Sequence, residues 1–590
     1  MNTETCPLGK DAAYQTSITK MERMLAANGF EIEVVSWQNP VPHVWSVHLR
    51  DRNCPQLYTN GKGHSRDAAL ASALGEFHER LACDFFFSEH FFGNEIANGA
   101  FVHHPHEKWF PADKSFALNQ ILPEELAAFY DASSVLTGPE LVDFNSGNST
   151  RGICTLPFVR VKDSETVYFP VNILNNLYVS NGMAAGNTRH EARVQALSEI
   201  IERYVKNRII SECIALPDVP QDVLNSFPRI TAGIEKLRQA GFHILVRDAS
   251  LCDTGSGLRF PVINVTLLNP INNGVFAAFG AHPIFEVALE RTLTELLQGR
   301  SLDALNDFPP PSLYVEEVAN PRNLEIHFVD STGLIHFQFL KDTPDYPFTH
   351  WDFQGETENQ YDFLVSIIQK MGKQIYVADY DHCGVYCCRI IIPRMSEVYP
   401  IEDLIWENKS QSVPVRHHVL APAQLTIDDQ HALYQFMEEK SFSREQPLSD
   451  LMGVLPADDS RWASLSVGEF NALLCLSCRN LTDALLWSEW CASSSLLSAE
   501  RQKLFTCIHT ILTIETDETQ HLSEYHSSLK KLFGEVPFTL ALRMIDGNEV
   551  FDGLVDFEDA LKEEFAFAPH AKLLSAYKKC QRAKLIQANG

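Results

Sequence analysis

The sequence has no excess of positive charge and no long apolar run. Its 590 residues carry 48 lysines and arginines against 76 aspartates and glutamates, for a formal net charge of -28. Broad binding to nucleic acid or to an anionic membrane surface needs the opposite balance, so we expect neither. A membrane-spanning helix needs roughly 18 or more mainly apolar residues in succession, and no such run occurs. Because the N-terminal segment also lacks a basic stretch followed by an apolar one, we expect a cytoplasmic protein.

Standard nucleotide- and metal-binding motifs are missing as well. The sequence contains no GxxxxGK[ST] phosphate loop, no GxGxxG, no kinase motif set and no HExxH zinc motif. Its 14 cysteines are scattered, and without an export signal we expect them to be reduced thiols. Cys475 and Cys478 form a CxxC, but no second pair stands nearby to complete a zinc site. They lie in an apolar helical pattern, which favours packing in a core.

A unit of helix, glycine, strand and second strand recurs three times between residues 1 and 425. Gly29, Gly241 and Gly372 each follow an amphipathic segment and precede a run rich in isoleucine and valine. A glycine at a helix C-terminus adopts the left-handed conformation, and β-branched runs suit strands. Asn273-Gly274, between two apolar runs, predicts a hairpin turn. We therefore expect an α+β fold for residues 1–425, with internal repeats.

The remaining residues, 426–590, lack strand signals and follow helical periodicity. Helical hairpins of about this length stack into tetratricopeptide-like arrays, so we expect an all-helical, tetratricopeptide-like C-terminal domain. We also expect this domain to mediate self-association or partner docking. A homodimer is the commonest closed assembly and is the expected one here.

The most informative pattern is a set of three helices that carry glutamates, or a glutamate and a glutamine, three positions apart. In two of them a glycine stands thirteen residues before the first glutamate, and the run Ala-Leu-x-Glu-x-x-Glu-Arg ends the motif. Ser65 and Thr188, two residues after those glycines, suit helix N-caps. Residues three apart share one helical face, so each helix should project a pair. The pairs are Glu76 and Glu79, Glu199 and Glu202, and, in a looser third copy, Glu295 and Gln298.

These pairs have two interpretations. A single ExxER on a helix is commonly a solvated face with short-range salt bridges. Its repetition with matched flanks and caps, beside apolar neighbours, instead predicts carboxylates that point inward. Buried carboxylates without partners are costly, and a cation offsets that cost. Carboxylate oxygens favour Mg²⁺ or Ca²⁺ over zinc or copper, and Mg²⁺ commonly bridges carboxylates to phosphate oxygens, which indicates a nucleotide.

The stretches SALGEFHER, ALSEIIER and ERTLTELLQ resemble the three ATP-binding stretches of the YcaO family, in order and at similar separations. The resemblance extends over nearly the whole chain, including LYVSNGMAAGNTR, FGAHP and TELLQGR. It implies a distinct ATP fold that holds Mg²⁺ between its glutamates and the triphosphate. The implied magnesium ligands are Glu76, Glu79, Glu199, Glu202 and Glu295. The implied nucleotide- or phosphate-contacting residues are Lys10, Ser17, Asn187, Arg203, Arg291 and Gln298.

Some of these residues also have simpler interpretations. Lys10 could be a solvated residue near a terminus, and Asn187 could be a turn residue. Arg203 could only pair with Glu199 at helical spacing. We expect the histidines near the motifs to be capping or surface residues, and we assign no catalytic base. These histidines are His64, His78, His190 and His282.

The resemblance implies ATP-dependent activation of a backbone amide in a protein substrate, through phosphorylation of the amide oxygen. The sequence ends in KCQRAKLIQANG, without the proline-rich tail of the ring-forming members, so we do not expect azoline formation. It is similar instead to the group associated with methylthiolation of an aspartate in small-subunit ribosomal protein twelve. We expect an ATP-hydrolysing accessory factor for that β-methylthiolation, with a protein substrate and a radical methylthiotransferase as partners. The alternative is a non-catalytic, nucleotide-responsive scaffold that recruits the methylthiotransferase.

Overall fold

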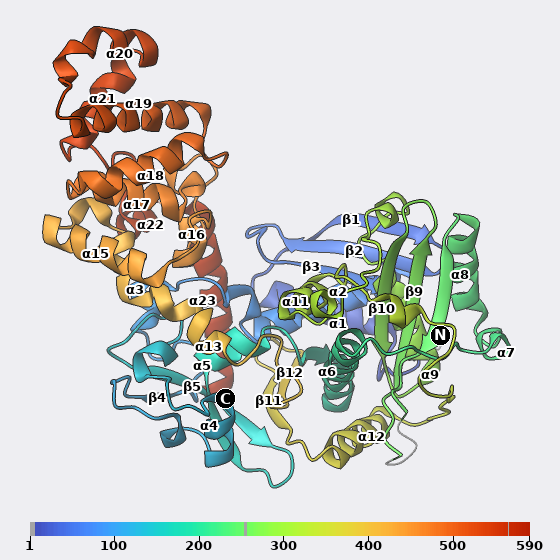
Figure 1. Cartoon of the computed structure of the whole chain (residues 1–590). Coiled ribbons are helices and arrows are strands. Elements are labelled where there is room, and N and C mark those ends of the chain that lie inside the picture. Colours follow the sequence, from blue (N-terminus) through green and yellow to red (C-terminus); the bar gives the residue numbers. More distant parts are fainter. Residues whose placement is uncertain (1–5, 253–256, 564–565, 590) are drawn as a thin grey trace.

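The computed structural model describes residues 6–252, 257–563 and 566–589 (Figure 1). Three antiparallel sheets and the helices around them form a first part, and a stack of helices projects from it. This mixture of helices with antiparallel strands confirms the α+β prediction. Among the described helices, none combines the length and the apolar character needed to span a membrane.

Neighbouring strands in all three sheets of the first part are antiparallel. One sheet has the order β1-β2-β3, with β1 at Ile32–Val41, β2 at Val44–Asp51 and β3 at Tyr58–Gly63. Another has the order β10-β9-β8, with β8 at His243–Asp248, β9 at Val262–Asn269 and β10 at Gly274–Ala281. The largest has the order β4-β5-β11-β12-β7, with β6 beside β5. Its strands are β4 (Lys108–Phe110), β5 (Ile153–Arg160), β6 (Thr166–Pro170), β7 (Met183–Gly186), β11 (Tyr376–Tyr380) and β12 (Tyr386–Ile391).

The predicted helix-glycine-strand-strand unit occurs three times in the structure. Its helices are α1 (Tyr14–Ala27) before β1, α8 (Pro228–Gln239) before β8 and α12 (Thr357–Lys370) before β11. Gly29, Gly241 and Gly372 have φ angles of 82°, 99° and 70°. This is the left-handed conformation expected after a helix, so these residues end each helix and turn the chain into its strand. The hairpin of β9 and β10 is also confirmed, with Asn273 at a φ of 62°.

Each glutamate helix follows directly on a strand. The three helices are α2 (Arg66–Ala82) after β3, α6 (Arg189–Ser211) after β7 and α9 (Phe285–Leu296) after β10. Ser65 and Thr188 cap α2 and α6 as predicted, because their side-chain oxygens accept hydrogen bonds from the backbone of the first turn. The strand-to-helix turn therefore sets the direction in which each glutamate pair points.

The glycines that begin the first two motifs allow close packing between strand and helix. A Cβ added to Gly63 would lie 2.6 Å from the side chain of Ala68, and one added to Gly186 would lie 2.5 Å from the backbone nitrogen of Ala192. Both distances are well inside van der Waals contact. A larger residue at either position would push the glutamate helix away from its strand.

Helices alone make up the projecting part, which confirms the predicted loss of strands beyond residue 426 among the described residues. Its helices are α15 (Ile427–Lys440), α16 (Leu448–Met452), α17 (Val467–Ser477), α18 (Leu481–Ser493), α19 (Ala499–Thr516), α20 (His526–Phe533), α21 (Glu535–Ile545) and α22 (Phe557–Glu563). Cys475 and Cys478 are buried, Cys475 within α17 and Cys478 directly after it, as the apolar pattern predicts. Whether this stack is tetratricopeptide-like stays a prediction.

The last helix, α23 (Ala568–Asn589), leaves the stack and packs on the first part of the chain (Figure 1). Tyr577 is fully buried, with its ring stacked on Phe92 at 4.1 Å between centroids and against Phe87 at 4.9 Å. Lys584 donates to both carboxylate oxygens of Asp84 at 2.6 Å, directly beyond the end of α2. The boundary at residues 425 and 426 stays a prediction, but a chain shortened there would lose α23 and expose these apolar side chains.

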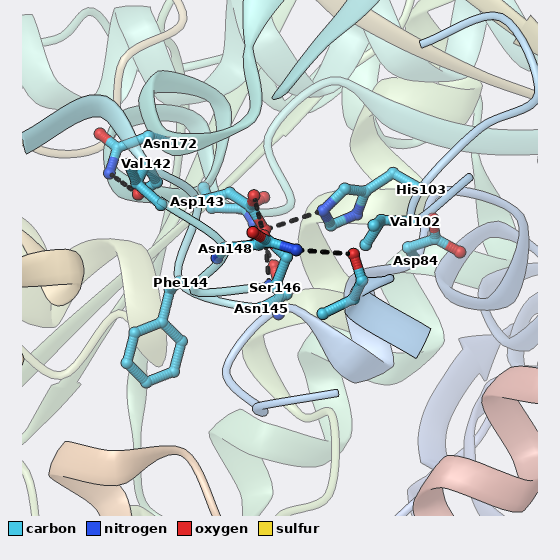
Figure 2. Close-up of polar contacts among 12 residues, drawn as sticks. Asp84, Val102, His103, Val142, Asp143, Phe144, Asn145, Ser146, Asn148 and Asn172 are labelled. Carbon is cyan, nitrogen blue, oxygen red and sulfur yellow. Dashed lines mark hydrogen bonds and ion pairs between the residues drawn. The ribbon is translucent and has the colours of Figure 1, made fainter. Parts of the chain in front are cut away.

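A buried polar network around His103 and Asp143 is connected to this contact; Figure 2 shows the network. His103 Nε2 lies 3.0 Å from Asp143 Oδ1, and Ser146 Oγ donates to Asp143 Oδ2 at 2.6 Å. Burial alone would lower the pKa of His103, but the hydrogen bond and charge of Asp143 outweigh it and raise that pKa. Burial acts in the opposite sense on Asp143, and His103 outweighs it, so the pKa of Asp143 is lowered. The backbone oxygen of His103 in turn accepts a hydrogen bond from Lys584 at 2.7 Å.

Candidate functional site

The three glutamate helices converge on one cavity of about 730 Å³. Residues at the start of the chain, between 6 and 21, complete its wall, together with the ends of strands β3, β7 and β10. The glutamate pairs of α2 and α6 therefore face a common space. This confirms the expectation that these carboxylates point inward.

All eleven residues that the sequence assigns to the metal or the nucleotide line this cavity. They are Lys10, Ser17, Glu76, Glu79, Asn187, Glu199, Glu202, Arg203, Arg291, Glu295 and Gln298. They come from four separated parts of the sequence, so the fold brings them together. Their individual roles as ligands stay predictions.

On α2, the two glutamates differ in how their charge is balanced. Glu76 forms an ion pair with Arg80, one helical turn further on. Glu79 has no cationic group within 4.0 Å in the described part of the chain. Burial, together with the charges of Glu199 and Glu76, raises the pKa of Glu79 well above its ordinary value. Glu79 is therefore a carboxylate whose negative charge lacks a partner, which is the condition that a bound cation relieves.

On α6, the same division recurs. Arg203 pairs with Glu199 at 3.0 Å, as the simpler interpretation holds, and it also lines the cavity. The guanidinium carbon of Arg203 lies 4.0 Å from the ring centroid of Phe328, and its Nη1 is buried without a hydrogen-bond partner. Glu202 accepts a hydrogen bond from the backbone N–H of Ala281 at 3.2 Å. Arg203 thus keeps an unsatisfied donor beside the cavity.

The third copy departs from the predicted geometry. We expected Glu295 and Gln298 to share a helical face, but α9 ends at Leu296 and Gln298 lies beyond it. Gln298 Nε2 donates to the backbone oxygen of Asn60 on β3 at 2.8 Å, so its side chain ties the helix end to that strand. Glu295 pairs with Lys62, also from β3. The motif repeat ends early here because the chain turns after Leu296, although both side chains still reach the cavity.

The N-terminal segment reaches the cavity through one buried carboxylate, Glu191. Lys10 Nζ lies 3.4 Å from Glu191 Oε1, and Asn187 Nδ2 donates to Glu191 Oε2 at 2.9 Å. Ser17 Oγ donates to Asn187 Oδ1 at 2.9 Å. Lys10 is therefore partnered and only partly exposed, and Asn187 does more than form a turn. Each of the two simpler interpretations is incomplete.

The four histidines near the motifs take different positions. His282 is buried and its Nδ1 accepts from the backbone N–H of Ile284 at 3.1 Å, but α9 has no side-chain cap, so His282 is neither a helix cap nor a surface residue. Burial, then the charges of Arg291 and Lys10, lower the pKa of His282 well below its usual value. His78 is fully buried with a pKa lowered to about 4 by burial, so the surface assignment is wrong for it. His64 Nδ1 lies 2.8 Å from Glu290, and the ring of His190 lies 5.9 Å from that of Tyr361.

Sequence motifs did not single out five charged residues of the cavity wall, which are Lys62, Glu191, Arg229, Glu286 and Glu290. The sequence does not single out Glu191 as a site residue because the spacing Thr188-x-x-Glu191 is also typical of a helix-capping box. Lys62 stands between two glycines in the stretch NGKG, next to a strand end where a charged residue is unremarkable. Glu290 precedes Arg291 in the third copy, and only its placement opposite His64 distinguishes it.

The donor set fits a magnesium nucleotide better than a bare cation. Within the described residues, no three histidine, cysteine, aspartate or glutamate side chains group closely enough to hold a metal ion alone. Mg²⁺ usually takes only one or two carboxylates and completes its shell with water and phosphate oxygens. Eight glutamates and six lysines or arginines line the cavity, so groups for both the metal and the phosphates are present. Arg80 Nε and Arg203 Nη1 are buried donors without partners, which phosphate oxygens would satisfy.

The sequence is similar to known proteins along almost its whole length. The family model of the YcaO cyclodehydratases, described as ATP- and Mg²⁺-binding, matches residues 60–396. The model of the YcaO cyclodehydratase C-terminal domain matches residues 412–585. The Escherichia coli K12 protein named ribosomal protein S12 methylthiotransferase accessory factor YcaO is 47% identical over 587 residues, which cover 99% of both chains. An uncharacterised Haemophilus influenzae protein is 45% identical over 591 residues, again covering 99% of both chains.

Solved structures give weaker similarities. YcaO from Methanopyrus kandleri bound with AMPPCP and Mg²⁺ is 20% identical, with 65% of this chain and 92% of that chain covered at a TM-score of 0.38. A heterocyclase in complex with substrate and cofactor is 17% identical, with 70% of this chain and 56% of that chain covered at a TM-score of 0.42.

Proposed function

This chain belongs to the YcaO family, and we propose that it binds ATP with Mg²⁺ in the three-helix cavity and uses ATP to activate a backbone amide of a protein substrate. One observation carries the binding step. Glu79 lines the cavity and forms no ion pair within 4.0 Å in the described part of the chain, while Arg80 Nε and Arg203 Nη1, from the same cavity wall, are buried donors without an acceptor. A metal ion would neutralise the carboxylate of Glu79, and phosphate oxygens would accept hydrogen bonds from the arginine donors. A magnesium nucleotide supplies both groups.

Different residues of the cavity would bind the metal ion and the phosphates of the nucleotide. Glu76, Glu79, Glu199, Glu202 and Glu295 would hold Mg²⁺, which supplies positive charge against the triphosphate. Arg203 and Arg291 line the same cavity and would offset the remaining phosphate charge. Lys10, Ser17, Asn187 and Gln298 offer ammonium, hydroxyl and amide groups around it. Because these groups are held in place by helices and by each other, little reorganisation is needed when phosphate charge shifts during transfer.

The biological role proposed for this activity is that of an accessory factor in β-methylthiolation of ribosomal protein S12. Its support is the name of the Escherichia coli relative, which is 47% identical over nearly all of both chains. In this role a protein substrate supplies the amide oxygen that receives the phosphoryl group, and a radical methylthiotransferase is the partner. The helical stack, as a tetratricopeptide-like domain, would dock that partner, and a homodimer is the proposed assembly.

A second candidate is a scaffold in which ATP binding changes how the partner is held. The contact between α23 and the end of α2 favours it, because it connects the helical stack to the helix that carries Glu76 and Glu79. In this alternative ATP binds but a substrate does not accelerate its turnover. Phosphate release therefore separates the two candidates.

Calorimetric titration with Mg-ATP tests the binding step. Glu79→Gln and Glu202→Gln should weaken binding by at least about tenfold, because a neutral amide is a poor ligand for a hard cation. Glu212→Gln is the matched control, since Glu212 pairs with Arg208 on the outer end of α6 and does not line the cavity. Affinities within twofold of the native protein for both cavity variants would remove these residues from the site.

Phosphate release tests the chemical step. The protein alone should hydrolyse ATP slowly, because without a substrate only water can accept the phosphoryl group. Addition of ribosomal protein S12 together with the methylthiotransferase should raise the rate, and Arg291→Ala should abolish the rise. A rate that the proteins leave unchanged, with Mg-ATP binding intact, would favour the scaffold.

A further inference from the structure

Lys62 is placed between two of the glutamate helices. It stands on β3, which leads into α2, and its ammonium forms an ion pair with Glu295 of α9. The side chain is 26% exposed and that of Glu295 is 32% exposed, and both line the cavity. Gln298 holds the end of α9 on β3 by its 2.8 Å bond to Asn60, so the two elements that carry the pair are fixed to each other.

The surroundings of Lys62 contain more charge than this one pair. Burial lowers the pKa of Lys62 to about 8, while the charge of Glu202 acts to raise it and that of Arg291 to lower it. Glu76 and Glu199 add further negative charge within reach. The ammonium therefore occupies a region where carboxylates of all three helices meet, which is where the proposed metal would also have to lie.

The pairing of Lys62 differs from that of the arginines on the glutamate helices. Arg80 and Arg203 pair with glutamates one turn away on their own helices, so the helix itself fixes each pair. Lys62 and Glu295 belong to different elements, and a lysine ammonium sits on a flexible stem with three rotatable donors. The pair can open without any change of helix geometry.

We propose that Lys62 is an exchangeable counter-cation, which neutralises Glu295 in the nucleotide-free cavity and moves to the triphosphate when Mg²⁺ takes its place at the carboxylate. The inference rests on the proposed function of the cavity. It gives Lys62 two roles with opposite consequences: it competes with a metal ion for Glu295, and it helps to hold the phosphates. A residue that only supports the fold would not separate metal binding from nucleotide binding in this way.

Lys62→Met in the full-length protein tests the exchange, with Mn²⁺ alone and Mg-AMPPCP as the two probes. Loss of the competing ammonium should tighten Mn²⁺ binding, measured by electron paramagnetic resonance, by roughly three- to tenfold. Loss of a charge-assisted contact should weaken Mg-AMPPCP binding, measured by calorimetry, by at least about tenfold. Lys236→Met, which removes an exposed lysine from α8, is the control for the loss of one positive charge and should change neither affinity.

Only opposite shifts support the proposal. If Lys62→Met binds both Mn²⁺ and Mg-AMPPCP more weakly, Lys62 is a structural residue. If the variant binds both more tightly, Lys62 competes with the metal but does not hold the phosphates. Unchanged binding of either probe also overturns the proposal. Lys62→Gln should give the same split if Lys62→Met does not fold, and Lys62→Arg should retain most nucleotide affinity. Failure of the native protein to bind Mg-AMPPCP would instead refute the proposed function itself.

Discussion

The buried ion pair between Lys584 and Asp84 should make a large contribution to the attachment of α23. Lys584 has 2% of its side chain exposed and donates to Asp84 Oδ1, Asp84 Oδ2 and the backbone oxygen of His103. Lys584→Met preserves much of the side-chain volume but leaves Asp84 with a buried, uncompensated charge. Removal of one partner of a buried pair typically costs about 3–5 kcal/mol, so we expect a loss of about 3 kcal/mol or more in the free energy of unfolding.

A second lysine on the same helix provides the matched control. Lys578 pairs with Glu95 at 2.8 Å, but Glu95 is 81% exposed, so solvent screens the interaction. Exposed pairs contribute about 0.2–1 kcal/mol, and Lys578→Met should therefore have a small effect. Both variants remove one lysine from one helix, so their difference reports the burial of the charge and not the change in composition.

Hydrogen exchange measured by mass spectrometry, together with denaturant unfolding, decides the matter. A loss of about 3 kcal/mol should accelerate exchange in α23 by roughly a hundredfold in Lys584→Met, since each 1.4 kcal/mol is a factor of ten. Asp84→Asn, which suits the left-handed φ of 57° at this position, should recover about 1 kcal/mol or more when combined with Lys584→Met. Equal effects of Lys584→Met and Lys578→Met, or no recovery in the double variant, would refute the reasoning.

Two further predictions concern the packing of α2 and the polar network beneath α23. Gly63→Ala should destabilise the protein by about 1–3 kcal/mol in thermal unfolding, because the added Cβ would lie 2.6 Å from the side chain of Ala68. Gly75→Ala is the control: its Cβ would have no atom nearer than 3.9 Å, so the change should be neutral or stabilising by about 0.5–1 kcal/mol. The raised pKa of His103 means that its contribution to stability is fully present below its unfolded pKa and is lost as the pH rises through its folded pKa. His103→Gln should therefore remove part of the decline in unfolding free energy above about pH 6.5, and an identical pH profile in the variant would contradict the assignment.

The sequence predicts the helices that carry the candidate site well because its signals are local and repeated. Helix caps at Ser65 and Thr188, and glycines with positive φ after three helices, depend on a few neighbouring residues, and the structure has them where expected. The ExxER spacing defines one face of a helix regardless of tertiary context. The prediction that Glu295 and Gln298 share one helical face was wrong because the position of Gln298 depends on a distant contact. Its side chain is held by Asn60, more than two hundred residues earlier in the chain.

Contacts between distant segments are what the sequence could not supply. Nothing local to α23 shows that Tyr577 stacks on Phe92, because an apolar helical face predicts burial but not its partner. Nor does the stretch around Lys62 show that its ammonium meets Glu295 across the cavity. Both contacts follow from the arrangement of sheets and helices, which no single motif encodes.

The two complete ExxER motifs suggest why the arginine stands where it does. In α2 and in α6 the arginine stands four residues after the first glutamate and pairs with it. The second glutamate stands directly before the arginine and has no cationic partner within 4.0 Å in the described part of the chain. Neutralising the first carboxylate limits repulsion inside the cavity, and leaving the second unpaired keeps a strong ligand ready for a cation. In the third copy the arginine precedes Glu295, and β3 supplies the counter-charge through Lys62 instead. The spacing of the motif therefore sets the difference between a compensated and an available carboxylate, and Glu79→Gln should weaken Mg-ATP binding more than Glu76→Gln.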